Sequence, residues 1–323
     1  MQLKNILPFL CLLLTLSLVN CKEKADASAQ ANTEKSTSTD QAFFKLSLAQ
    51  WSLHKAIYGG KLDPLDFAET AKKYGFQGIE YVNNLYNKYL KDTTEAGLTL
   101  DELLPKLKAK SEEFGVENVL IMVDSEGNLA DSDEDQRNQA VENHKKWVDA
   151  AAYLGCHAIR VNLNGATEKE AWISNSVLGL GQLARYGKSK GINVIVENHG
   201  GFSSNAEYLT TVMERIQMDN CGTLPDFGNF CIKRENGTCV ELYDYYQGTE
   251  TLMKHAKAVS AKSYGFDAEG NETTLDYPRL VKIVKDAGYT GFIGVEYEGN
   301  DLSEEEGILA TKNLLLTSAA SLN

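Results

Sequence analysis

The chain has 323 residues, of which 43% are hydrophobic, and its 45 acidic and 32 basic residues give a formal net charge of −13 at pH 7. That charge weakens binding to phosphate backbones and anionic membrane surfaces, so it argues against a nucleic-acid partner. Residues 43–323 contain no second linker and are long enough for one large α/β domain.

The N-terminus has the features of a bacterial export signal. Lys4 precedes an apolar run, Ile6 to Val19, which is shorter than the roughly 20 residues of a membrane-spanning helix. The run ends in Leu18-Val19-Asn20-Cys21, which resembles a lipobox. We therefore expect residues 1–20 to be a signal peptide, Cys21 to be lipidated, and the polar residues 21–42 to form a flexible tether. This predicts a lipid-anchored protein of the cell envelope, periplasmic or surface-facing.

From Phe44 onward, short apolar segments alternate with longer segments of helical periodicity. Eight strand candidates start 30 to 41 residues apart, a spacing that suits βα units around a parallel sheet. They begin near Phe44, Phe76, Val116, His157, Ile192, Gly222, Ala256 and Gly291.

The predicted helices support the same architecture. Those over 64–74, 100–114, 138–154 and 275–287 are each followed by a glycine, which is the usual C-cap. Eight such units predict a (β/α)8 TIM barrel. A doubly wound sheet is the alternative, but the turn after the first strand, Gln50-Trp51-Ser52-Leu53-His54, lacks the Gly-rich sequence typical of that fold.

Four cysteines remain once Cys11 is assigned to the signal and Cys21 to lipid. In an exported protein they can form disulfides. Cys231 and Cys239 flank a short polar segment and are the favoured pair, with Cys221 as a rival partner.

Ionisable and polar side chains gather at the predicted C-terminal ends of the strands, where the catalytic groups of TIM barrels lie. These ends carry Gln50, His54, Glu80, Asp124, Arg160, Asn162, Glu197, Asn198, His199, Asp226, Asn229, Ser260, Lys262, Asp267, Glu296 and Glu298. Glu197, Asp226 and Glu296 follow apolar strands at equivalent positions, in VIVE, TLPD and IGVE. Because hard divalent cations prefer oxygen ligands, these three carboxylates predict a metal site.

Three motifs carry a family resemblance that covers residues 44–318. Val196-Glu197-Asn198-His199, Leu224-Pro225-Asp226-Phe227-Gly228-Asn229 and Gly294-Val295-Glu296-Tyr297-Glu298-Gly299 resemble motifs of the xylose-isomerase-like superfamily of sugar phosphate isomerases and epimerases. The resemblance implies that Glu197 and Glu296 lie on opposite sides of a bound ketose, where they remove and return a proton. It also implies that both contact a divalent metal (Mn, Mg, Co or Zn), with Asp226 as a third ligand.

This assignment agrees with the chemistry, since a proton beside a carbonyl is labile only when the enediolate oxygen is stabilised. We expect other polar side chains at the strand ends to bind the carbohydrate, namely His54, Glu80, Asn162, His199, Asn229 and Ser260. Trp51, Tyr81 and Tyr86 are candidates to stack on a sugar face.

The seventh strand departs from the superfamily pattern. Many members have His-x-Lys-Asp there, with the histidine as fourth metal ligand, whereas this chain has Ser260-Ala261-Lys262-Ser263. His199 or water can take the fourth position. Alternatively, Lys262 is itself catalytic and stabilises an enolate in place of a tightly bound ion. A Schiff base at Lys262 would require a depressed pKa.

Three functions follow from these residues. The first is a sugar isomerase or epimerase, and the second is a lyase that uses the same proton abstraction on a 3-keto-glycoside. The third is a non-catalytic sugar-binding lipoprotein, which would not need two opposed glutamates. The endonuclease branch of the superfamily is disfavoured, because it binds several zinc ions through many histidines and this acidic chain has five.

Overall fold

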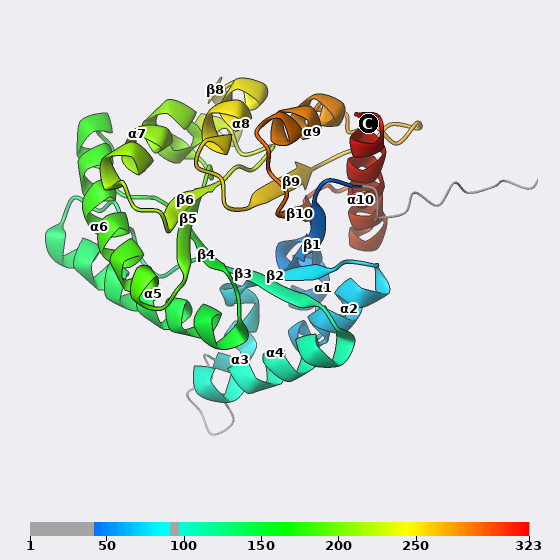
Figure 1. The fold of residues 1–323 in the computed structure, drawn as a ribbon, viewed down its shortest axis with the longest axis horizontal. Helices are drawn as coiled ribbons and strands as arrows, with labels where there is room; N and C mark the ends of the chain where they lie inside the picture. Colours follow the sequence, from blue (N-terminus) through cyan, green and yellow to red (C-terminus); the bar gives the residue numbers. More distant parts are fainter. Residues whose placement is uncertain (1–41, 91–96, 323) are drawn as a thin grey trace, which may run out of the picture. The chain divides into compact units, whose positions relative to one another are not determined.

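The computed structural model describes residues 42–90 and 97–322. The predicted signal peptide and Cys21 lie outside the described residues. Within them, eight parallel strands curl into a barrel and helices surround it (Figure 1). The TIM barrel prediction is therefore confirmed.

The strands of the barrel begin one to three residues from their predicted starts. They are β1 (Lys45–Ala49), β2 (Gly78–Val82), β3 (Glu117–Val123), β4 (Ala158–Val161), β5 (Asn193–Glu197), β6 (Cys221–Leu224), β9 (Val259–Ser263) and β10 (Phe292–Tyr297). Their order is β6-β5-β4-β3-β2-β1-β10-β9. Two isolated parallel bridges, Thr223 with Ala256 and Asp226 with Ser260, close the ring between β6 and β9.

The outer helices pack against one another around this sheet (Figure 1). They are α2 (Phe67–Lys73), α4 (Leu100–Phe114), α5 (Glu134–Leu154), α6 (Lys169–Ser189), α7 (Ala206–Ile216), α8 (Tyr245–Met253), α9 (Tyr277–Asp286) and α10 (Glu304–Ala320). Short helices α1 (His54–Tyr58) and α3 (Asn87–Leu90), and the 3-10 turns η2 (Gln50–Leu53), η3 (Pro64–Asp66), η4 (Asn83–Tyr86) and η5 (Gly201–Ser204), lie in connections. In the described part of the chain, no helix combines the length and apolarity needed to cross a membrane.

Helix starts differ from the predictions where a capping side chain decides the boundary. Helix α5 begins at Glu134 rather than at residue 138, because the Asp133 carboxylate accepts a hydrogen bond from the Gln136 N–H. Helix α9 begins at Tyr277 rather than at residue 275, because Asp276 caps it in the same way. Helix ends were predicted better, since Gly115 and Gly155 adopt left-handed conformations directly after α4 and α5.

A hairpin interrupts the connection between β6 and α8. Its strands β7 (Cys231–Glu235) and β8 (Thr238–Leu242) pair antiparallel, and a disulfide joins Cys231 to Cys239. Asn236 and Gly237 both have positive φ angles, as a tight hairpin turn requires. Cys221, the rival partner, is a buried free thiol.

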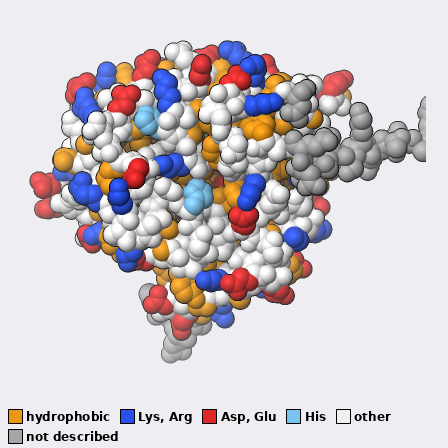
Figure 2. Space-filling view, viewed as in Figure 1, with side chains coloured by type: hydrophobic (Ala, Val, Ile, Leu, Met, Phe, Trp, Pro, Cys, Tyr) orange, Lys and Arg blue, Asp and Glu red, His pale blue; other side chains and the backbone are white. Residues whose placement is uncertain are grey.

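The core fills the barrel and the space between strands and helices, with fully buried Leu, Ile and Val side chains on every strand except β7 and β8. Acidic and basic side chains are interspersed over the face seen in Figure 2. The negative charge therefore gathers in no single patch on that face.

Candidate active site

Three carboxylates meet inside the C-terminal end of the barrel. Glu197 ends β5, Asp226 follows β6, and Glu296 lies near the end of β10. Each offers an oxygen, and these oxygens lie within 4.8 Å of one another. The exposed fractions of the three residues are 1%, 0% and 3%. The predicted trio therefore forms one buried acidic triad.

The turn after β6 fixes Asp226 and links it to Glu197. Asp226 Oδ1 accepts hydrogen bonds from the backbone N–H groups of Gly228 (2.9 Å) and Asn229 (2.8 Å). The Asn229 side-chain amide donates to Glu197 Oε1 at 2.9 Å. Behind them, the Asn198 amide oxygen accepts from the Asp226 N–H at 2.8 Å. The predicted substrate ligand Asn229 thus also holds two members of the triad together.

Strand β9 contributes Ser260 and Lys262 to the same cluster. Ser260 Oγ lies 2.6 Å from Asp226 Oδ2 and 3.1 Å from Glu296 Oε2. Lys262 Nζ lies 3.0 Å from Glu296 Oε1, 3.3 Å from Glu298 Oε1 and 3.8 Å from Asp226 Oδ2. The serine that replaces the superfamily histidine therefore contacts two triad carboxylates, and the lysine sits beside them.

Arg160 covers the opposite side of the triad. Its Nε lies 2.8 Å from Glu197 Oε2, and its Nη1 donates to Asp124 Oδ1 at 2.8 Å. Asn162 donates to the same Asp124 oxygen at 2.7 Å. Glu197 Oε2 is buried and accepts no hydrogen bond of good geometry. Its contact with Arg160 Nε is therefore an ion pair without good hydrogen-bond geometry.

The surroundings separate the pKa values of the triad. Burial acts to raise the pKa of Glu197, but the nearby cationic groups, Arg160 first among them, together outweigh it and hold the pKa below its usual range. Burial raises the pKa of Glu296 above its ordinary value despite the nearby Lys262 ammonium. Burial also raises the pKa of Asp226 to about 8. The two glutamates therefore have opposite tendencies, Glu197 to be ionised and Glu296 to hold a proton.

Lys262 is held in its charged form. Burial lowers the pKa of its ammonium, but Glu296 and Asp226 outweigh that effect and the pKa lies well above its ordinary value. A Schiff base needs a neutral amine, so these surroundings do not suit one.

Glu80 lies deeper in the barrel, in β2. Its Oε1 accepts a hydrogen bond from Ser47 Oγ at 2.6 Å, and burial raises its pKa to about 8. The adjacent strand provides room for this carboxyl group at Gly294, where a Cβ would lie 2.5 Å from Glu80 Oε1. The glycine in the IGVE segment is therefore explained by the carboxyl group that packs against it.

A polar cavity of about 560 Å³ borders the triad at Glu296. Its lining includes Asp124, Arg160, Asn162, His199, Glu296 and Glu298. Of the predicted substrate ligands, Asn162 and His199 line it directly. His54 instead stacks on Trp51, with ring centroids 4.4 Å apart, and Trp51 lines the cavity.

Aromatic residues were predicted less well than charged ones. Tyr81 and Tyr86, candidates to stack on a sugar, are buried in the core at 3% and 2% exposure. The Tyr81 hydroxyl donates to Asn118 Oδ1, and the Tyr86 hydroxyl donates to the Pro64 carbonyl oxygen. Tyr58 lines the cavity instead and is 62% exposed. The sequence indicated this position of Tyr58, because Tyr58 follows His54 on α1 and that helix comes soon after the end of the first strand.

Glu298, which directly follows β10, belongs to the site although its sequence position did not predict a role for it. It lines the cavity and pairs with Lys262. The signal was its spacing from Glu296, since residues two apart on a strand point to the same face.

Comparisons with known proteins agree with this architecture. Solved structures of similar fold include 3-keto-D-glucoside 4-epimerase from E. coli (14% identity, TM-score 0.64, covering 85% of this chain and 99% of that one). D-psicose 3-epimerase with D-tagatose from Clostridium cellulolyticum gives 15% identity and a TM-score of 0.59, covering 86% and 96%. The IOLI protein with a zinc atom gives 16% identity and a TM-score of 0.62, covering 86% and 99%.

A shorter match in sequence concerns the C-glycoside deglycosidase alpha subunit of Arthrobacter globiformis. The two chains are 38% identical over 60 residues, which is 18% of this chain and 17% of that subunit. The match spans less than a fifth of the relative's length.

The family itself is shown by a longer match. The model described as xylose isomerase-like TIM barrel matches residues 68–316, from α2 to α10, and includes all three carboxylates of the triad. This chain therefore belongs to the xylose isomerase-like TIM barrel family.

Proposed function

We propose that the protein is a sugar isomerase or epimerase that moves a proton on the carbon beside a sugar carbonyl through an enediolate. The observation that carries this proposal is the buried triad of Glu197, Asp226 and Glu296, which borders a polar cavity of about 560 Å³ at Glu296. That volume is within the usual range for small-molecule sites. Epimerases named for sugar substrates share the fold.

The donor set of the triad suits a divalent cation. Three carboxylate oxygens within 4.8 Å of one another match the preference of hard cations for oxygen, and Ser260 adds a neutral oxygen beside two of them. When bound, such a cation acts as a Lewis acid that stabilises charge on the substrate oxygens. The Lys262 ammonium and the Arg160 guanidinium provide further positive charge on either side.

The two glutamates divide the proton transfer between them. Glu197, whose pKa is lowered by Arg160, is suited to accept the proton. Glu296, whose pKa is raised by burial and which lines the cavity, is suited to return it. Opposed pKa tendencies of this kind are how paired carboxyl groups take separate acid and base roles.

A lyase is the second candidate, favoured by the partial match to a C-glycoside deglycosidase subunit. In a 3-keto-glycoside, the same base would remove the C2 proton beside the carbonyl. The C1–C2 double bond would form as the C1–O bond breaks, and the departing oxygen would take a proton to leave as an alcohol. Glu296 would supply that proton.

Solvent exchange tests the proposal. The purified domain, loaded with Mn²⁺, is incubated in deuterated water with a free ketose or with a 3-keto-glucoside. Deuterium in the recovered or isomeric sugar supports epimerisation, whereas release of the aglycone supports the lyase. Absence of both reactions with every sugar, at saturating metal, would refute enzymatic function and leave a sugar-binding protein.

A matched pair of variants checks the site. Glu296→Gln should abolish exchange, since the amide neither returns a proton nor carries charge. Glu304→Gln is the control, because Glu304 lies outside the cavity and caps the backbone N–H groups of Lys55 and Ala56. Normal turnover by Glu296→Gln would show that the active site lies elsewhere.

We also propose that lipid at Cys21 anchors this activity in the cell envelope. Free sugars and glycosides, rather than sugar phosphates, are the accessible substrates there. Incorporation of labelled palmitate into the full chain, and its loss in Cys21→Ala, is the expected result. Equal labelling of the two chains would contradict the anchor.

A further inference from the structure

A second hollow of about 690 Å³ lies beside the polar cavity, and we refer to it as the side hollow. Its walls come from the connections after β3, β4 and β5, from α6 and from the β7–β8 hairpin. Its apolar side chains are Leu163, Ala166, Trp172, Phe202 and Ile232. The proposed proton transfer uses none of these residues.

The side hollow adjoins the polar cavity. Asn128 and Asn164 line both. The connections that carry these asparagines are joined by backbone hydrogen bonds, from Ala130 N to Asn164 O and from Ala166 N to Ala130 O, each 2.9 Å. At Gly165 a Cβ would lie 2.0 Å from the Ala130 carbonyl carbon, so the two connections touch directly. These two hydrogen-bonded connections therefore form a rigid border that the two spaces share.

The two spaces differ in chemistry. The polar cavity is lined by carboxylates, amides and a guanidinium, as a polyhydroxylated sugar requires. In the side hollow, Trp172 is buried and its indole N–H donates to Leu163 O at 2.9 Å, while the half-buried Phe202 and Ile232 provide apolar surface. Trp172 and Phe202 pack together with ring centroids 5.8 Å apart. A ligand that fills both spaces is therefore polar at one end and apolar at the other.

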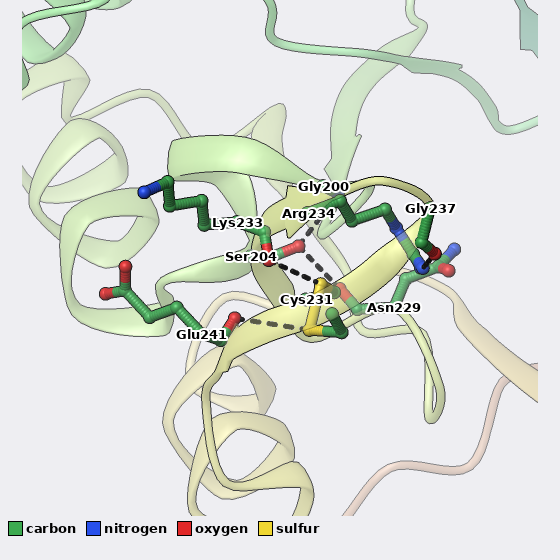
Figure 3. The surroundings of a disulfide bond; sticks show 9 residues. Gly200, Ser204, Asn229, Cys231, Lys233, Arg234, Gly237 and Glu241 are labelled. Carbon is green, nitrogen blue, oxygen red and sulfur yellow. Dashed lines mark hydrogen bonds between the residues drawn. A yellow bond between two sulfur atoms is a disulfide. The ribbon is translucent and has the colours of Figure 1, made fainter.

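The hairpin forms a further wall, and its two strands are joined covalently. The Cys231–Cys239 disulfide joins its two strands, and Lys233 and Glu241 extend from the side that borders the hollow (Figure 3). Ser204 accepts a hydrogen bond from Gly200 N at 2.8 Å and donates to Asn229 O at 2.7 Å. The connection after β5 is thereby tied to the segment that leads into the hairpin and carries Asn229.

We propose that the side hollow binds the apolar aglycone of a glycoside, most simply an aromatic ring, while the keto-sugar lies over the triad. This inference rests on the proposed sugar-carbonyl chemistry and names its substrate class. It holds for epimerisation of the glycoside and for its cleavage. The shared border at Asn128 and Asn164 places the glycosidic bond between the two spaces.

The test compares phenyl and methyl 3-keto-β-glucosides, which differ only in the aglycone. Burial of a phenyl ring should lower KM for the phenyl compound by roughly tenfold or more, and calorimetry should show the same preference in Kd. Phe202→Ala and Ile232→Ser should each reduce that preference about fivefold or more, and should leave kcat/KM for the methyl compound within about twofold.

Val240→Ser is the matched control, because Val240 lies on the same hairpin, is 52% exposed and does not border the hollow. Equal KM and Kd for the two glucosides, or an equal effect of Phe202→Ala on both, would overturn the aglycone site even if deuterium exchange is normal. Absence of exchange with a retained phenyl preference in Kd would instead overturn the proposed reaction and leave the aglycone site standing.

Discussion

Lys262 places a positive charge 3.0 Å from Glu296, one of the proposed metal ligands. Removing that charge in Lys262→Met should tighten divalent cation binding by roughly tenfold or more, because repulsion between the ammonium and the metal disappears. Turnover should fall, since Lys262 also provides positive charge beside the triad. Calorimetric titration with Mn²⁺ measures the first effect and deuterium exchange the second.

Lys262→Arg keeps the charge and is the control for Lys262→Met. It should bind the metal about as the wild type does. Weaker metal binding by Lys262→Met would show that the lysine chiefly orients Glu296. Full activity of either protein after exhaustive chelation would show that a cationic side chain, and not a metal, stabilises the oxyanion.

Glu80 makes folding stability dependent on pH. Burial raises its folded-state pKa to about 8 from an ordinary 4.5, so the unfolded chain loses this proton at lower pH than the folded one. The resulting stability is fully present below the unfolded pKa and is lost as pH rises toward 8. Between pH 5 and pH 7 the wild type should lose about 2–3 kcal/mol that Glu80→Gln does not lose. Urea unfolding of both proteins across this range measures the difference.

The exposed Glu117, on β3, supplies the control for Glu80. Glu117→Gln should follow the wild-type pH profile. A constant offset between Glu80→Gln and the wild type at every pH would show that Glu80 is ionised in the folded protein.

Site residues could be predicted from sequence where their position at a strand end was enough to locate them. Glu197, Asp226 and Glu296 follow apolar strands, and parallel strand ends converge, so their meeting was predictable. The contacts of Arg160 with Glu197, and of Asn229 with both Glu197 and Asp226, depend on loop and rotamer geometry. Sequence position does not determine these contacts.

At the scale of elements, the disulfide should stabilise the hairpin against local unfolding far more than it stabilises the barrel. It closes a short loop between Cys231 and Cys239, whose entropy accounts for about 2–3 kcal/mol in the chain-entropy model. In Cys231→Ser/Cys239→Ser, amide exchange in β7 and β8 should accelerate by up to about a hundredfold, with little change in β1 to β5. Hydrogen exchange with mass spectrometry measures both regions.

Reductant supplies the control for the disulfide prediction. It should accelerate hairpin exchange in the wild type and have no effect on the double variant. Uniform acceleration across the barrel strands would contradict the separation of hairpin and barrel stability.

The elements were predictable where a periodic pattern defines them. Apolar runs and terminal glycines located the barrel strands and the ends of α4 and α5. The hairpin was missed because its strands are short and mostly exposed, so they carry little hydrophobic pattern. The Asn236-Gly237 pair was its one strong sequence signal.

The whole barrel depends on how its ring is closed. β6 and β9 are joined by two isolated bridges, whereas the other neighbouring strands pair over three residues or more. Pro225 contributes to this weak pairing, because it lacks an N–H and follows directly after β6. The triad lies across this seam, with Glu197 and Asp226 on one side and Glu296 on the other.

A cation that binds the triad should therefore stabilise the folded barrel as a whole. At a hundredfold excess over Kd, binding to the native state alone contributes about 2.7 kcal/mol, which for a domain of this size raises Tm by about 5 °C. Chelation should reverse the shift in the wild type. Asp226→Asn keeps the acceptor oxygen for Gly228 and Asn229 but loses the charged ligand, so its Tm should respond little. Differential scanning calorimetry with Mn²⁺ and with chelator measures both proteins, and equal responses would show that the metal binds outside the seam.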